Sequence, residues 1–266
     1  MTISAVIFDW AGTMLDHGSR APMGAFVKVF ADFQVTITVA EARGPMGLPK
    51  LEHIKALLKH PDIAARWTEA HGKAPTDDDA NRIFDVFVPL NAAVVTDYAD
   101  LIPGILDIHA ELRGRGIKIG STTGYTREIM ERVLPLATAA GLSTDNLICA
   151  GDMPLGRPTP MMMYKCFLDL AVWPAASVIK VDDTEVGIAE GVNAGCWTIG
   201  VALSGNAAGV SHDELAALSE AEVSQLRTKA TRQLARSGAH YVIDSVAQLM
   251  PVLDAIEGRL ARGERP

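Results

Sequence analysis

The chain has 266 residues, of which 48% are hydrophobic and 21% charged, a balance typical of a globular protein rather than a disordered one. Its net charge of -8 argues against a dedicated nucleic-acid-binding protein, and no apolar stretch approaches the roughly 20 residues needed to cross a bilayer. The three cysteines form no pattern and no secretory leader opens the chain, so we expect a cytoplasmic protein with buried, reduced thiols.

The first predicted element is a buried strand, Ala5–Trp10, in which every residue except Asp9 is apolar and which is followed by turn-forming residues. No convincing strand follows before residue 99. Instead, about five helical patterns fill this stretch, at Pro22–Phe33, Val39–Arg43, Pro49–Lys59, Pro61–His71 and Thr76–Tyr98. We therefore expect an α-helical cap domain over residues 19–99, inserted after the first strand and standing over the sheet edge where open α/β folds bind ligands.

Strands and helices alternate in the rest of the chain. Apolar runs predict strands at Lys118–Thr123, Asn146–Ala150, Ser177–Asp183, Trp197–Ala202 and His240–Asp244. Helical patterns cover Gly104–Arg115, Thr126–Ala140, Pro160–Ala171, Val186–Ala194 and Ser245–Arg259, and polar Ser211–Ser237 predicts a helical excursion on the surface. This alternation predicts an α/β core domain over residues 1–18 and 100–266, a Rossmann-like parallel sheet with helices on both faces.

The first cap helix carries a stripe of apolar side chains, Phe26, Val29, Phe30 and Phe33. A stripe with this spacing lies along one face of a helix. It packs either into the core of the cap, which is the commoner arrangement, or against a second subunit. The sequence leaves both alternatives open.

Four groups of polar residues fall at the ends of predicted strands, where a parallel sheet meets its ligands. Asp9 is a carboxylate that could attack phosphorus and form an aspartyl-phosphate. Asp182 and Asp183 are paired acids suited to Mg²⁺, which keeps several waters and takes carboxylate ligands. Gly120–Tyr125, placed after the second strand, offers hydroxyls and N–H groups for phosphate oxygens at a helix start, and Arg157 offers a fixed cation.

This ordered set resembles the haloacid dehalogenase superfamily, with the helical insert in the position of that superfamily's cap. The resemblance implies that Asp9 is the nucleophile and a metal ligand, that Thr123 supplies a phosphate-binding hydroxyl and that Arg157 is the neutralising cation. It also implies that Mg²⁺ is held by Asp183 and the backbone carbonyl of Ala11, with Asp182 as a possible further ligand.

Three positions depart from the superfamily's usual pattern. Most of its phosphatases have a second aspartate two residues after the nucleophile, which protonates the leaving oxygen, whereas this chain has Ala11. Asp182 stands where many relatives have glycine, and Gly187 where some have another acid. An alanine cannot donate a proton, so the leaving group must need no such acid or the protein must lack activity.

The cap segment Arg43–His53 suggests how the alanine is accommodated. Lys50 and His53 are three residues apart and share one helix face. Together with the Asp9–Thr13 segment and the motifs of the core, this segment resembles the phosphonatase family across nearly the whole chain. The resemblance implies that Lys50 forms a Schiff base, that His53 is a proton shuttle, and that substrate is contacted by Met46, Gly47 and Tyr125. It also implies a homodimer joined through the caps.

The expected activity is hydrolysis of the carbon–phosphorus bond of phosphonoacetaldehyde to acetaldehyde and phosphate, in the breakdown of phosphonates such as 2-aminoethylphosphonate. Expulsion of a carbon leaving group is easier when an adjacent iminium takes up its electrons, which does the work that protonation does for an alcohol. The expected partner is a small phosphonate, with neither nucleic acid nor membrane. Two alternatives stay open: a capped phosphatase or phosphomutase acting on a phosphate ester, and a non-catalytic phosphate- or metal-binding protein.

Overall fold

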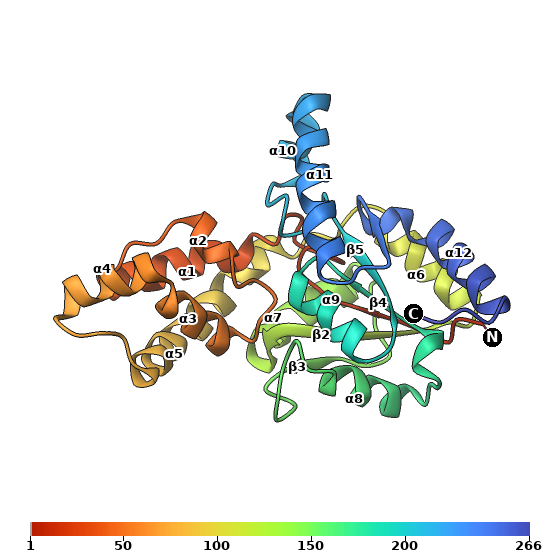
Figure 1. The fold of residues 1–266 in the computed structure, drawn as a ribbon, viewed down its shortest axis with the longest axis horizontal. Coiled ribbons are helices and arrows are strands. Elements are labelled where there is room, and N and C mark those ends of the chain that lie inside the picture. The colour runs from red at the N-terminus through yellow and green to blue at the C-terminus, as the bar shows by residue number, and fades with distance from the viewer. Residues whose placement is uncertain (1) are drawn as a thin grey trace.

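A six-stranded parallel sheet forms the centre of the computed structural model, which describes residues 2–266 (Figure 1). The strands are β1 Ala5–Phe8, β2 Lys118–Thr126, β3 Ile148–Ala150, β4 Val178–Asp182, β5 Trp197–Val201 and β6 Tyr241–Ile243. Their order is β3-β2-β1-β4-β5-β6, and every adjacent pair runs parallel. The predicted Rossmann-like α/β class is therefore confirmed.

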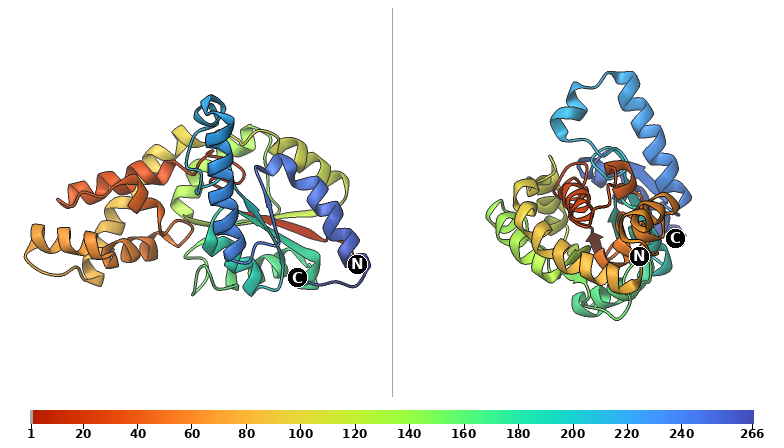
Figure 2. Two further views of the ribbon diagram at one scale, coloured as in Figure 1. Left: turned by 45° about the horizontal axis from the view of Figure 1, so that its top comes forward. Right: turned by 90° about the vertical axis from the view of Figure 1, so that its left-hand side faces the viewer.

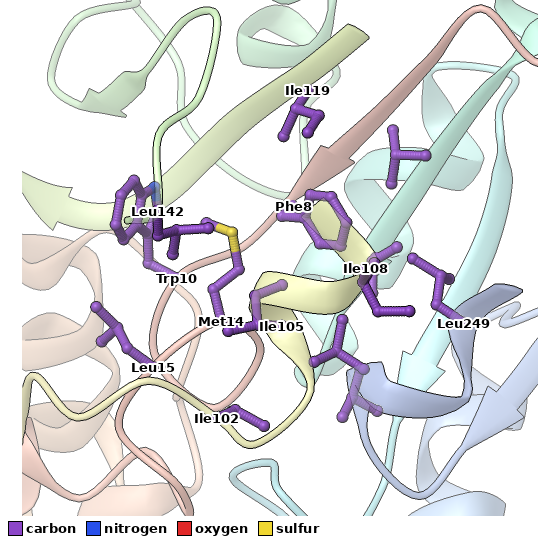
Figure 3. Packing of buried hydrophobic residues seen from close by; sticks show 14 of the residues in the cluster. Phe8, Trp10, Met14, Leu15, Ile102, Ile105, Ile108, Ile119, Leu142 and Leu249 are labelled. Atoms are coloured by element: carbon purple, nitrogen blue, oxygen red, sulfur yellow. The ribbon is translucent and has the colours of Figure 1, made fainter. Parts of the chain in front are cut away.

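Helices cover both faces of the sheet because successive side chains of a strand point to opposite faces. Val6 and Phe8 of β1 pack in one hydrophobic cluster with α6 (Ile105–Gly114), α7 (Arg127–Ala139) and α12 (Leu249–Ala261). Figure 3 shows Phe8 and Ile119 beside residues of α6 and α12. Ala5 and Ile7 join a second cluster with α8 (Met161–Leu170), and α9 (Glu185–Asn193) also contacts β4 and β5. Short 3-10 helices lie at Val95–Tyr98, Ala175–Ser177 and Val246–Gln248.

Five helices fill the predicted insert and have a hydrophobic cluster of their own. They are α1 Ala21–Asp32, α2 Val39–Arg43, α3 Lys50–Lys59, α4 Pro61–His71 and α5 Asp77–Val94. Figure 1 shows them beside the sheet, at its left. The start of α5 is fixed by a capping box between Thr76 and Asp79. The separate cluster supports the proposed division of the chain into core and cap.

The apolar stripe of α1 packs inside the cap. Phe26, Val29 and Phe30 are completely buried there, and Phe33 is partly buried against the same cluster. The stripe therefore belongs to the cap core, which was the commoner of the two alternatives. A homodimer through the caps stays a prediction, and it would need another surface.

The polar segment after β5 projects from the sheet as two helices, α10 His212–Ala217 and α11 Glu220–Arg236 (Figure 2). No residue of α10 is buried, and only Ala230 and Leu234 of α11 are. The predicted surface excursion is thus correct. All three cysteines are free and buried, as expected. Within residues 2–266, no helix combines the length and the apolar character needed to span a membrane.

Two strand boundaries differ from prediction in ways that affect the site. β1 ends at Phe8, so Asp9 is the first residue beyond the strand. β2 extends to Thr126, because its pairing with β3 resumes after a register shift and ends with Thr126 opposite Ala150. The prediction that Gly120–Tyr125 follows the strand at a helix start is therefore wrong: the segment lies within β2, and α7 begins only after it.

Candidate active site

A small cavity lies where the cap meets the carboxyl edge of the sheet. Its volume of about 20 Å³ leaves room for about one water molecule. Core and cap both contribute to its wall, which is lined by Asp9, Ala11, Ser19, Pro22, Met46, Gly47, Lys50, Thr123, Gly124, Tyr125, Arg157 and Thr184. This wall includes every predicted site residue except His53, Asp182 and Asp183.

The cap loop that precedes α3 makes a close approach to the core. Gly47 has a φ of +88°, and a Cβ atom there would lie only 2.3 Å from Oγ1 of Thr184. Any side chain at this position would force the loop away from the start of α9. Glycine therefore lets the loop deliver Lys50, the first residue of α3, to the cavity.

Lys50 is an amine enclosed mainly by apolar groups. Its side chain is buried, with Nζ 4.0 Å from Sδ of Met46, 5.7 Å from the ring centre of Phe26 and 5.1 Å from that of Tyr125. Burial lowers the pKa of Lys50 to about 8, with Arg157 acting in the same direction and Asp9 opposing it. A neutral, nucleophilic amine is consequently accessible near neutral pH.

His53 lies behind this amine and does not line the cavity. Its Nε2 donates to the carbonyl of Ala42 at 2.8 Å, and its ring stacks on Phe26 with centroids 4.1 Å apart. Because a carbonyl only accepts, Nε2 carries the proton and Nδ1, which is buried without a partner, is the unprotonated nitrogen. Burial, and then the nearby Lys50, lower the pKa of His53 well below its usual value, so the ring is neutral.

Arg157 connects Asp9 to the buried acids below the cavity. Its guanidinium is 1% exposed and lies 2.9 Å from Oδ1 of Asp9, 3.3 Å from Oδ2 of Asp182 and 3.1 Å from Oε2 of Glu190. It also donates to the carbonyl and hydroxyl oxygens of Thr122 at 2.8 and 2.9 Å. These contacts hold the guanidinium beside Asp9, where the predicted neutralising role requires a cation.

A second buried cation, Lys180, was missed by sequence reasoning. Its Nζ lies 3.1 Å from Oδ2 of Asp182 and 3.3 Å from Oε2 of Glu190, and donates to Oγ1 of Thr122 at 2.7 Å. All four side chains are completely buried. A lysine in the middle of a buried strand was the available signal, because a buried charge must have partners.

Three carboxylates could hold a metal ion. One oxygen of each of Asp9, Asp182 and Asp183 lies within 4.8 Å of the others, and all three residues are buried. Burial and the charge of Asp182 raise the pKa of Asp9 to about 6. Burial, Asp9 and Asp182 raise the pKa of Asp183 well above its usual value. Such crowding of like charges is relieved by a divalent cation.

Asp183 is the better-suited metal ligand of the adjacent pair. Its Oδ2 accepts the N–H of Asn206 at 2.7 Å, but its Oδ1 is buried and has no hydrogen-bond partner among residues 2–266. Asp182 instead accepts from N and Oγ1 of Thr184 at 2.9 and 2.7 Å. Although burial opposes its ionisation, Arg157 and Lys180 hold the pKa of Asp182 below its usual value. These contacts favour assigning the metal to Asp9 and Asp183.

The two unusual residues of the acidic motif depend on each other. A Cβ atom on Gly187 would lie 2.0 Å from Cγ of Asp182 and 2.1 Å or less from both of its carboxylate oxygens. The Asp182 carboxylate thus occupies the space that a side chain at position 187 would need. An aspartate at 182 therefore requires a glycine at 187.

Comparison with known proteins agrees with this fold and site. A family model described as haloacid dehalogenase-like hydrolase matches residues 3–195, so the chain belongs to that class of hydrolases. The structure of β-phosphoglucomutase from Clostridium difficile shares this fold alone, with a TM-score of 0.70 at 17% identity, covering 98% of this chain and 100% of that one.

Relatives with higher sequence identity indicate one family within this class. Proteins named phosphonoacetaldehyde hydrolase from Paraburkholderia phytofirmans and from Bordetella avium are 55% and 45% identical to this chain; both matches cover 99% of it, and 99% and 94% of the relatives. A crystal structure of a phosphonoacetaldehyde hydrolase-like protein from Oleispira antarctica is 42% identical with a TM-score of 0.99, covering 100% of this chain and 96% of the other. The chain belongs to the phosphonoacetaldehyde hydrolase family.

Proposed function

We propose that this protein hydrolyses the carbon–phosphorus bond of phosphonoacetaldehyde, giving acetaldehyde and phosphate. The observation that carries the proposal is the pairing in one cavity of a buried amine, Lys50, with a carboxylate nucleophile, Asp9. Ala11 lines the same cavity, so the position two residues after Asp9 offers no carboxyl group to protonate a leaving group. The names of the relatives support the same substrate.

The reaction begins at Lys50. The neutral amine adds to the aldehyde carbon and water leaves, giving an imine that is protonated at nitrogen. One oxygen of Asp9 then attacks phosphorus while the carbon–phosphorus bond breaks, and the electron pair of that bond enters the iminium to form an enamine. Protonation at carbon and addition of water release acetaldehyde and return the amine. A second water cleaves the aspartyl-phosphate and releases phosphate.

The core side chains stabilise the phosphoryl group during its transfer. Arg157, 2.9 Å from Asp9, offsets negative charge on the transferred oxygens, and Thr123 offers its hydroxyl in the same cavity. Mg²⁺ would be held by Asp9, Asp183 and the backbone carbonyl of Ala11, and when bound it supplies two further positive charges there. The buried, unpartnered Oδ1 of Asp183 fits such an ion.

The cap side chains handle the carbon end of the substrate. Met46 and Tyr125 flank Lys50 and keep water from it, and Gly47 keeps the loop close. His53 offers its unprotonated Nδ1 as a proton acceptor for the steps at nitrogen. Because the cavity has room for about one water molecule, substrate entry requires the cap to move away from the core, and its return excludes bulk water.

The test combines turnover with covalent trapping. Purified protein is given phosphonoacetaldehyde with and without Mg²⁺, acetaldehyde and phosphate are assayed, and borohydride reduces any imine for mapping by mass spectrometry. We expect Mg²⁺-dependent turnover and an adduct on Lys50. Lys50→Ala should lose both, whereas Lys59→Ala, at the exposed end of the same helix, should lose neither.

Each other outcome has a defined meaning. Full activity of Lys50→Ala would overturn the imine route. Turnover of simple phosphate esters, but not of phosphonoacetaldehyde, would favour the capped phosphatase or phosphomutase. Failure to turn over either kind of substrate would point to a non-catalytic binding protein.

A further inference from the structure

One arginine of the cap reaches into the core. Arg43 is the last residue of α2, immediately before the loop that leads to Lys50. Its Nη1 donates to the carbonyl of Gly18 at 2.8 Å and to Oδ1 of Asn206 at 3.0 Å, and its Nη2 donates to the carbonyl of Gly209 at 3.0 Å. The guanidinium therefore joins three pieces of chain: the cap, the segment connecting β1 to α1, and the loop after β5.

The loop after β5 also holds a metal-site carboxylate. The N–H of Asn206 donates to Oδ2 of Asp183 at 2.7 Å, while the side chain of the same asparagine accepts from Arg43. A continuous set of hydrogen bonds thus runs from the cap through Asn206 to Asp183. The cap end of this set is the residue that begins the Lys50 loop, so it connects the two chemical halves of the site.

The loop is shaped to receive the guanidinium. Gly209 has a φ of +68°, and a Cβ atom there would lie 2.8 Å from Cζ and 2.9 Å from Nε of Arg43. Any side chain at position 209 would push the arginine from its place. Arg43 forms no ion pair within the described chain, so its contacts are a fork of N–H donors matched to oxygens of fixed position.

Other arginines of the cap do not make this connection. Arg66 contacts the carbonyl of Thr36 and the carboxylate of Glu41, both in the cap. Arg82 pairs with Asp79 on its own helix. Arg66 is therefore a useful control, a partly buried cap arginine whose contacts with a carbonyl and a carboxylate stay within the cap.

We propose that Arg43 is a positioning residue that latches the cap onto the core and couples cap closure to the placement of the Asp183 carboxylate. The proposal rests on the proposed function, in which Lys50 of the cap and Asp183 of the core act on one substrate. With Arg43 seated, the Lys50 loop is anchored at its start and Asn206 is fixed from two sides. When the cap opens, Asn206 loses the arginine and the support of Asp183 loosens.

Two variants disturb the latch independently. Arg43→Lys keeps the charge but lacks the fork that spans three acceptors. Gly209→Ala keeps Arg43 and fills its seat. For both we expect kcat to fall about tenfold, and the affinity for Mn²⁺, used as a spectroscopic probe of the metal site, to weaken several-fold. Hydrogen exchange should rise in segments 16–20 and 204–210, with the rest of the core protected as before. Arg66→Lys should match the wild type in all three measurements.

Several results would overturn the latch. Wild-type Mn²⁺ affinity and exchange in both Arg43→Lys and Gly209→Ala would show that closure and the metal site are independent. A general rise in exchange across the core would show that Arg43 serves only stability. Metal affinity and exchange need no substrate, so they test the latch even if the wild type fails to hydrolyse phosphonoacetaldehyde, and the two failures stay distinguishable.

Discussion

The covalent step at Lys50 should have a distinctive dependence on pH, because only the neutral amine attacks the aldehyde. With the pKa lowered to about 8 by burial, we expect trapping of the imine to accelerate from pH 6 and to level off above pH 8. Between pH 6 and pH 8 the neutral fraction rises about fifty-fold, from about 1% to about half. A lysine kept at 10.5, the value before burial, would be about 0.03% neutral at pH 7, so burial gains about 300-fold.

The measurement is the rate of cyanoborohydride trapping at each pH, followed on the peptide that contains Lys50. The exposed Lys59 in the same samples reports any non-specific labelling. The variant Asp9→Asn, which should retain imine formation but lose phosphoryl transfer, separates this step from turnover. A trapping rate that kept rising tenfold per pH unit up to pH 10 would refute the argument, because it would mean that the apolar enclosure leaves the amine charged as in water.

Three further predictions follow from the same site. Since the folded-state pKa of Lys50 lies below its unfolded value, the stability linked to this group is full above about pH 10.5 and is lost as pH falls through 8. Lys50→Met should therefore raise the free energy of unfolding by about 3 kcal/mol at pH 7 and by less than about 1 kcal/mol at pH 10, as measured by urea denaturation. Saturating Mg²⁺ at about 100 times its Kd should stabilise the wild type by about 2.7 kcal/mol and Asp183→Asn hardly at all, and an equal thermal shift in both would remove Asp183 from the metal site. Ala11→Asp should place a carboxylate near Lys50 and raise the pKa of the amine by about one unit or more, which slows imine trapping about tenfold at pH 7; an unchanged trapping profile would show that the two side chains do not interact.

Much of the fold was predictable because its signals are local. Apolar runs such as Ala5–Trp10, separated by helical periodicity, predict a parallel sheet without knowledge of any distant contact. Prolines and capping residues likewise located the cap helices, as with Thr76 at the start of α5. The end of β2 was missed because its last residues are held by pairing with β3 across a register shift, which no local pattern reveals.

The features of the site likewise fall into two groups, those that the sequence predicted and those that it did not. The carboxylates and Arg157 stand in recognisable segments, so sequence pointed to them, and the cavity gathers Asp9, Lys50 and Arg157. Steric contacts within the folded chain escaped it. The exclusion of a side chain at Gly187 by Asp182 and the seating of Arg43 against Gly209 are steric facts of the folded chain. Such contacts appear only when the segments are placed in space.

The three crowded carboxylates have a consequence for the order of events. Four buried acids face two buried cations below the cavity, and burial beside Asp9 and Asp182 raises the pKa of Asp183, so protons compete for this carboxylate more strongly than for an exposed one. A divalent ion and a proton compete for the same oxygens, so metal binding should weaken as the pH falls. The doubly charged phosphonate would meet repulsion from an uncompensated site. Metal should therefore bind first, and acidification should act on the enzyme as chelation does.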